Sequence, residues 1–177
     1  MGSRDAKKAV IATVADDRPG LVAELSALVS GLSLNIEDSR MTVLGGEFAV
    51  LMSVSGDEAA LAGLDKALAE QAERGGFAYL YRRTGERPGA ARQRLVAGIE
   101  AMDHPGIVAG VASFFSQRGV NIREMTTETT RAAHTGAPVF SLEMEIELPE
   151  AASEKELRQA FQAFCEAEHL DGVLGDS

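Results

Sequence analysis

The sequence predicts an α+β fold in which two ferredoxin-like βαββαβ units follow one another along the chain. Asp17-Arg18-Pro19-Gly20-Leu21-Val22 recurs 86 residues later as Asp103-His104-Pro105-Gly106-Ile107-Val108, and Asn35-Ile36 recurs at the same spacing as Asn121-Ile122. Each copy also repeats the order of short strand, amphipathic helix, hairpin and second helix. A repeat of this length indicates two copies of one fold, each a four-stranded antiparallel sheet with two helices on one face.

The length of 177 residues therefore divides into two small domains. Units of about 80 to 90 residues can each fold around a core of their own. We expect the first domain over residues 1–84, a linker over 85–94 and the second domain over 95–177. The linker segment is rich in arginine, which fits a solvated connection or a contact with an acidic partner.

The first strand and helix follow from the start of each copy. Ala9–Ala15 predicts a strand that ends at the turn signal Asp16–Gly20, where Pro19 suits a first helical turn. The apolar residues that follow recur with the period of a helix. They are Leu21, Val22, Leu25, Leu28, Val29 and Leu32 in the first copy, and Ile107, Val108, Val111, Phe114 and Phe115 in the second. Gly119 suits the left-handed residue that ends such a helix, whereas the first copy has Ser33 there.

A β-hairpin comes next, because Gly45-Gly46 separates two strand-like runs. Alternation predicts that one face of the returning strand is buried. The inward residues are Phe48, Val50, Met52 and Val54 in the first copy, and Phe140, Leu142, Met144 and Ile146 in the second. The outward row Glu143, Glu145 and Glu147 predicts a wet outer face in the second copy. Six extra residues of the second hairpin are placed in the loop Arg131–Pro138.

A second helix and a closing strand complete each copy. Leu61, Leu64 and Leu68 form the helical stripe in the first, and Ser153 with Glu156 forms a capping box in the second. Phe77–Arg82 predicts the last strand of the first copy. The matching segment Leu170–Leu174 predicts a strand that is short or absent.

Composition restricts the classes of function. A net charge of −10 with a pI near 4.8 disfavours direct binding of nucleic acid. No apolar run approaches the roughly 18 residues of a membrane helix, and no secretory signal is evident, so a cytoplasmic location is expected. The single cysteine, Cys165, excludes an intramolecular disulfide and a multi-cysteine zinc site, and its position on a helical stripe predicts core packing.

Reactive side chains do not form a recognisable catalytic group. His104, His134 and His169 fall on a turn, a loop and a helix end, and no spacing links them to Cys165 as nucleophile or metal ligands. We therefore expect no catalytic residue, no metal and no cofactor.

The repeated sequence motifs resemble those of the ACT domain, a small regulatory module that typically binds amino acids. The resemblance rests on Asp-x-Pro-Gly-[Leu/Ile]-Val before the first helix and on Asn-Ile at the next strand, and it covers both halves of the chain. A tandem pair with no attached enzyme resembles the family of glycine cleavage system transcriptional repressors. That resemblance implies control of amino-acid metabolism through a protein partner, and neither copy offers a helix-turn-helix with a basic face.

The Pro-Gly turn has a physical reason to bind a carboxylate. A helix start presents unpaired N–H groups and the positive end of the helix dipole, and a glycine lets a ligand approach. The resemblance implies that a small amino acid, with glycine or serine favoured, lies between this turn of one unit and the asparagine of a paired unit. The candidate residues are Asp17, Arg18, Pro19, Gly20, Leu21, Asn35 and Ile36 in the first copy, and Asp103, His104, Pro105, Gly106, Ile107, Asn121 and Ile122 in the second.

The interpretation of the Pro-Gly turns as ligand-binding sites leaves two questions open. Asp17 and Asp103 either receive the ligand's ammonium group or cap the helix, since Asp is a favoured capping residue. The repeated Pro, Gly and Asn are also ordinary turn residues, which a duplication would preserve without any ligand. The protein is then either an amino-acid sensor, expected as a homodimer, or a ligand-free dimerisation module that serves as a regulatory subunit of a metabolic enzyme.

Overall fold

The computed structural model describes residues 7–75, 77–85, 93–132 and 135–176. The chain divides into two compact units, Met1–Pro88 (unit 1) and Gly89–Ser177 (unit 2). Most of the expected linker, 85–94, lies outside the described residues, as do two positions of the loop expected to hold the second hairpin's extra residues. No helix of the described ranges is long and apolar enough to cross a membrane.

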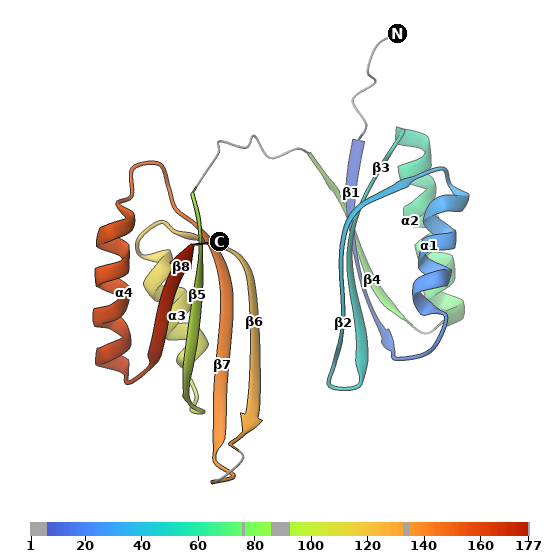
Figure 1. Cartoon of the computed structure of the whole chain (residues 1–177). Coiled ribbons are helices and arrows are strands. Elements are labelled where there is room, and N and C mark those ends of the chain that lie inside the picture. The colour runs from blue at the N-terminus through green and yellow to red at the C-terminus, as the bar shows by residue number, and fades with distance from the viewer. Residues whose placement is uncertain (1–6, 76, 86–92, 133–134, 177) are drawn as a thin grey trace. The chain divides into compact units, whose positions relative to one another are not determined.

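Unit 1 consists of β1 (Lys7–Asp16), α1 (Leu21–Gly31), β2 (Asn35–Leu44), β3 (Glu47–Gly56), α2 (Glu58–Gly75) and β4 (Ala78–Thr84). Its strands form one antiparallel sheet in the order β2-β3-β1-β4, and both helices cover the same face (Figure 1). The opposite face, which carries no helix, is called the open face below.

Unit 2 repeats this architecture with β5 (Arg94–Met102), α3 (Ile107–Ser116), β6 (Asn121–Arg131), β7 (Pro138–Glu147), α4 (Glu154–Glu168) and β8 (Asp171–Asp176). The sheet order is β6-β7-β5-β8. The predicted pair of ferredoxin-like units is thus confirmed. The last strand, predicted as short or absent, is present and short, and it pairs with β5 from Asp171 to Asp176.

The helix ends and the hairpin turn use left-handed backbone where it was expected. Gly45 and Gly46 have φ of 63° and 93°, which matches a two-residue turn with positive φ at both positions. Gly119 has φ of 68°, and Ser33 adopts nearly the same conformation at φ 58°. The first copy therefore keeps the helix-ending geometry without its glycine, at some cost in backbone strain.

Each unit has its own apolar core between the sheet and its helices. The inward rows of β3 and β7 are buried or half-buried as alternation predicted. In unit 2, Phe115 stacks on Phe161, with ring centroids 5.5 Å apart. Cys165 is buried in this core, which confirms its packing role, and burial together with the nearby Asp171 raises the pKa of its thiol to about 11.

The open faces of the two units differ in chemistry. In unit 1 the middle of that face carries exposed apolar side chains, among them Val14, Leu51 and Leu80. In unit 2, the expected row of solvated glutamates is only partly correct, because Glu145 and Glu147 have side chains 28% and 13% exposed. Arg94 and Arg123 lie against these carboxylates from the neighbouring strands, at 3.4 Å and 2.6 Å respectively, so pairing across the sheet replaces much of the water.

Candidate functional site

The two Pro-Gly turns share one backbone geometry. Gly20 and Gly106 are the N-cap residues of α1 and α3, with φ of 95° and 103°, a region that only glycine adopts without strain. The first helical hydrogen bond of α1 runs from the N–H of Glu24 to the carbonyl oxygen of Gly20, and that of α3 runs from the N–H of Gly110 to the carbonyl oxygen of Gly106, both at 2.9 Å. The three residues at the start of each helix, before Glu24 and before Gly110, have N–H groups without a partner within the helix. Each turn therefore presents donors suited to an anion.

Of the two roles considered for Asp17 and Asp103, the capping role is wrong. At both helix starts the cap is a glycine, without a side-chain cap hydrogen bond. Pro19 likewise precedes the helix, in the turn, and does not belong to its first turn. The reason is the left-handed glycine, which reverses the chain directly before Leu21 and so places Asp17 too far upstream to act as the N-cap.

The turn of unit 1 holds a carboxylate of its own. A hollow of about 540 Å³ lies over it. Its lining is Asp17, Arg18, Pro19, Gly20, Leu21, Val22, Ala23 and Phe48. The Arg18 guanidinium binds both carboxylate oxygens of Glu24 at 2.7 Å, and this hydrogen bonding lowers the pKa of Glu24. An amino-acid carboxylate arriving here would compete with Glu24 for Arg18.

The turn of unit 2 lacks this competitor. Gly110 stands at the position of Glu24, and His104 replaces Arg18 with its Nδ1 3.2 Å from the carbonyl oxygen of Pro105. A Cβ built on Gly106 would meet no described atom within 4 Å, so the approach to the helix start is open. Of the two turns, this one is better suited to an external carboxylate.

The two asparagines open corresponding strands in different surroundings. Asn35 pairs with Ser55 across the sheet, and its Nδ2 donates to Glu37 Oε1 at 3.0 Å. Ser55 donates to the same oxygen at 2.5 Å, and the hydrogen bonds from Ser55 and Asn35 lower the pKa of Glu37. The amide of Asn35 is therefore engaged by an internal carboxylate.

At Asn121 the neighbouring position is a cation. Arg123 stands where unit 1 has Glu37, and its Nη1 lies 2.6 Å from Glu147, the cross-strand partner of Asn121. An arginine cannot accept the asparagine's amide hydrogen. The half-buried Asn121 thus differs from Asn35 in a way that favours contact with a ligand. Ile36 and Ile122 are half-buried and pack against their own cores.

One unit does not bring its turn and its asparagine together. The turn follows Asp16, which pairs with Glu47, whereas Asn35 pairs with Ser55 at the other end of β3. Eight residues of strand separate these positions, roughly 26 Å. The same holds for Asp103 and Asn121 at the two ends of the sheet in unit 2. A site that uses both is therefore not completed within a single unit.

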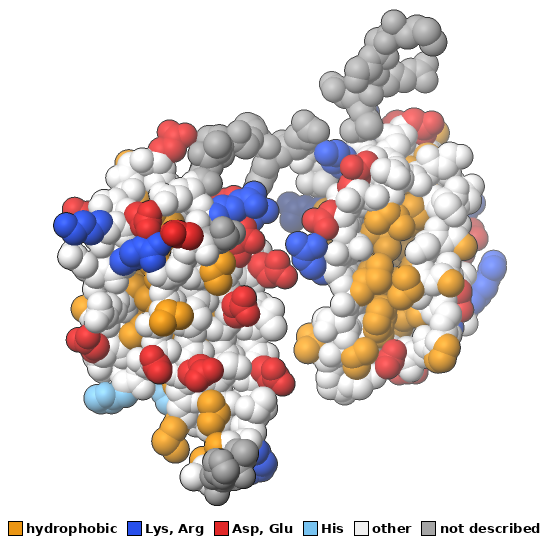
Figure 2. Space-filling model, viewed as in Figure 1, with side chains coloured by type: hydrophobic (Ala, Val, Ile, Leu, Met, Phe, Trp, Pro, Cys, Tyr) orange, Lys and Arg blue, Asp and Glu red, His pale blue; other side chains and the backbone are white. Residues whose placement is uncertain are grey.

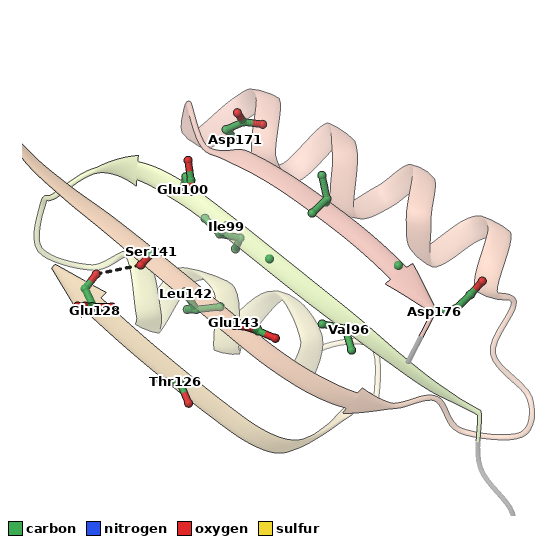
Figure 3. Close-up of a pocket in the computed structure, with 13 residues that line it drawn as sticks. Val96, Ile99, Glu100, Thr126, Glu128, Ser141, Leu142, Glu143, Asp171 and Asp176 are labelled. Atoms are coloured by element: carbon green, nitrogen blue, oxygen red, sulfur yellow. Dashed lines mark hydrogen bonds between the residues drawn. The ribbon is translucent and has the colours of Figure 1, made fainter. Parts of the chain in front are cut away.

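The open face of unit 2 carries a second hollow, of about 580 Å³, which sequence reasoning missed (Figure 3). Its floor is lined by Val96, Gly98, Val173 and Gly175, and carboxylates stand around it. These are Glu100, Glu128, Glu143, Asp171 and Asp176. Gly98 on β5 and Gly175 on β8, two positions apart on the same face of the sheet, were the available signal, because glycine inside a strand leaves room above the sheet. Within the described ranges, no three His, Cys, Asp or Glu residues are grouped to hold a metal ion.

Comparison with known proteins agrees with this architecture. Family models described as ACT domain match residues 8–79 and 96–162. The glycine cleavage system transcriptional repressor of Escherichia coli strain K12 is 28% identical over 166 residues, which span 93% of this chain and 87% of the repressor.

Two solved structures are similar over nearly the whole chain. The crystal structure of an unknown protein from Galdieria sulphuraria is 27% identical, covers 97% of this chain and 99% of its own, and superposes with a TM-score of 0.78. A second, of a candidate glycine cleavage system transcriptional repressor, is 24% identical with a TM-score of 0.72, and the match covers 96% of each chain. With both halves matched by the same kind of module, the chain belongs to the ACT-domain family as a tandem pair.

Proposed function

We propose that this protein is a regulatory sensor that binds a small amino acid at the turn of unit 2. The ligand's carboxylate accepts hydrogen bonds from the N–H groups at the start of α3, beside Gly106. The observation that carries the proposal is the contrast between the two turns. In the first turn the Glu24 carboxylate binds Arg18, whereas in the second turn Gly110 stands at the position of Glu24 and provides no carboxylate.

Asn121 is the proposed polar partner of the same ligand. Because it lies at the far end of its own sheet from Gly106, a complete site takes the turn from one unit and the asparagine from another. A homodimer is one way to supply such a pair. Glycine or serine are the favoured ligands by family resemblance, and a carboxylate small enough to sit against a bare glycine fits the open turn.

The output of the sensor passes through a protein partner. The name of the Escherichia coli relative points to transcriptional control of glycine metabolism. With a net charge of −10, this chain repels a phosphate backbone, so we propose contact with a regulatory protein and not with the DNA itself.

A second candidate function is a ligand-free dimerisation module, and unit 1 is the feature that favours it. There the turn and the asparagine are both engaged by internal carboxylates, Glu24 and Glu37. If unit 2 behaved in the same way, the protein would act as a regulatory subunit without sensing an amino acid.

Thermal unfolding in the presence of each of the twenty amino acids distinguishes the two functions. A ligand at about 100 times its Kd raises the free energy of unfolding by about 2.7 kcal/mol, which gives a clear shift. The ligand-free module predicts no shift with any of them.

Calorimetry on Asn121→Ala then tests the residue assignment. Loss of a hydrogen bond to a charged group costs about 1.5 to 3 kcal/mol, or roughly tenfold to more than a hundredfold in affinity. Asn35→Ala is the matched control, because Asn35 already donates to Glu37, and we expect its affinity to match the parent's. Equal affinity in Asn121→Ala and the parent would show that the ligand binds elsewhere.

A further inference from the structure

The open face of unit 1 combines exposed apolar side chains with charges at its two ends. The cross-strand registers place Leu51, Ala12 and Leu80 side by side, and Ala49, Val14 and Ala78 in the next row. Val14, Leu51 and Leu80 are 46%, 50% and 58% exposed. Figure 2 shows hydrophobic side chains gathered in a band on the side of unit 1 that this view presents. An apolar patch of this kind, bounded by polar residues, is typical of an interaction surface.

The charges bounding this patch have opposite signs at opposite ends of the strands. On β1, Lys8 lies at one end of the outward row and Asp16 at the other. Arg82 on β4 lies near the Lys8 end, opposite Val10, and Glu47 on β3 pairs with Asp16. Glu37 lies near Lys8 and offsets one of the two cations at that end, and Arg40 on β2 is balanced by Asp38 at 2.8 Å. The Lys8 end therefore keeps one net positive charge, against the two carboxylates of Asp16 and Glu47 at the other end.

We propose that this face binds the same face of a second copy of the chain, with the strands of the two sheets antiparallel. A two-fold axis that lies between the sheets, perpendicular to the strands, places the apolar centre of one copy on that of the other. It also places Lys8 of each copy opposite Asp16 of its partner copy. An axis along the strands would place Lys8 against Lys8 and Asp16 against Asp16, so the charges select the antiparallel arrangement.

The size of the face fits a reversible dimer. Four strands about 4.8 Å apart, over nine positions rising about 3.3 Å each, span roughly 570 Å². Two such faces together bury about 1,100 Å², near the lower limit of specific interfaces. The dimer should therefore dissociate on dilution, in contrast to an obligate dimer with a larger contact.

The open face of unit 2 provides an internal contrast. Glu100, Glu143 and Asp171 stand on that face, so two copies of it would repel each other. Self-association through the open face is accordingly a property of unit 1. The inference goes beyond the proposed function, because it needs no ligand and involves neither Gly106 nor Asn121.

Sedimentation equilibrium from micromolar to near-millimolar concentrations tests the proposal. We expect a monomer–dimer equilibrium in the parent without any amino acid. Leu51→Glu and Leu80→Glu, each present twice in a dimer, should weaken association about a hundredfold or more, because like charges would be buried against an apolar surface. Val173→Glu is the matched control: Val173 is 68% exposed on the open face of unit 2, and its substitution should leave association unchanged.

A charge exchange tests the orientation. Lys8→Glu and Asp16→Lys should each weaken the dimer about tenfold, and the double variant should restore it, because each new glutamate then faces a new lysine. Circular dichroism confirms that every variant is folded. A parent that stays monomeric at the highest concentration would overturn the proposal and assign the face to another occupant. Dimers insensitive to Leu51→Glu and Leu80→Glu, or a double variant no tighter than the single ones, would overturn it equally.

Discussion

Gly172 tests how closely the last strand packs on the core of unit 2. It lies on β8 opposite Ile99, on the inward face of the sheet. A methyl group at this position would lie 3.2 Å from Cε1 of Phe161 and 3.3 Å from Cβ of Cys165, and far inside contact distance of the Cys165 sulfur. Both neighbours are almost fully buried, so neither can move into solvent without opening the core.

Gly172→Ala should therefore destabilise unit 2 by about 1 to 3 kcal/mol, the usual cost of one excess methyl group in a packed core. For a unit of this size, 1 kcal/mol lowers the Tm by about 4 to 8 °C. The matched control is Gly98→Ala on β5, whose Cβ would lie 3.4 Å from Val173 on the open face, and we expect it to be near neutral. Urea unfolding followed by circular dichroism gives both values.

The cause of the destabilisation is tested by removing the sulfur. Cys165→Ala takes away the atom in closest conflict with the new methyl group. Gly172→Ala should then cost less in the Cys165→Ala background than in the parent, with a coupling of about 1 kcal/mol. If Gly172→Ala is as stable as Gly98→Ala, or if the two changes are additive, the packing argument is refuted.

Two further predictions follow from the backbone and from burial. Gly106→Ala should cost about 1 to 2 kcal/mol in unfolding free energy although no described atom obstructs the methyl group, because φ of 103° is strained for any L-residue. The control is Gly110→Ala, inside α3, which should be neutral or stabilising by up to about 1 kcal/mol. Equal stabilities of the two variants would contradict the argument. The Cys165 thiol, whose pKa is raised to about 11, should resist alkylation at pH 8, because roughly one thiol in a thousand is ionised there. It should react at an ordinary rate in urea. Rapid labelling of the folded protein would show that the site is open.

The strain at Gly106 affects how the site can be probed. A bulky residue there would block the ligand and also destabilise the turn, so loss of binding would have two explanations. Asn121→Ala changes a half-buried side chain on a regular strand and avoids this difficulty. The asparagine is therefore the more informative position.

Sequence patterns predicted the features that depend on local rules. The alternation around Val50 and Met52, the Gly45-Gly46 turn and the N-cap at Ser153, whose Oγ accepts from the Glu156 N–H, each depend on near neighbours, and the structure shows them. Features that depend on cross-strand register were missed, because no local pattern encodes which side chain lies across the sheet. The pairing of Glu145 and Glu147 with Arg94 and Arg123 belongs to this second group.

The same distinction explains the errors at the candidate site. Asp17 was taken as a possible cap because the residue type suits that role, but cap geometry is decided by Gly20 three positions later. Arg18 and Glu24, six residues apart, meet only because the left-handed glycine turns the chain back on itself. The sequence contained both residues without indicating that they bind each other.

The two copies share their backbone geometry and differ in charge at the positions of the proposed site. Glu24 corresponds to Gly110, and Glu37 to Arg123, so unit 2 has neither of the internal carboxylate acceptors of unit 1 at these positions. The open faces also differ: Leu51, Val14 and Leu80 are apolar on unit 1, whereas carboxylates lie on unit 2. Since a duplicated site needs only one copy to bind ligand and one to associate, these exchanges are consistent with a division of the two tasks between the units. Under that division, Leu51→Glu should weaken association about a hundredfold or more while unit 2 keeps its thermal stability. Asn121→Ala should weaken ligand binding without altering the monomer–dimer equilibrium measured in the absence of ligand.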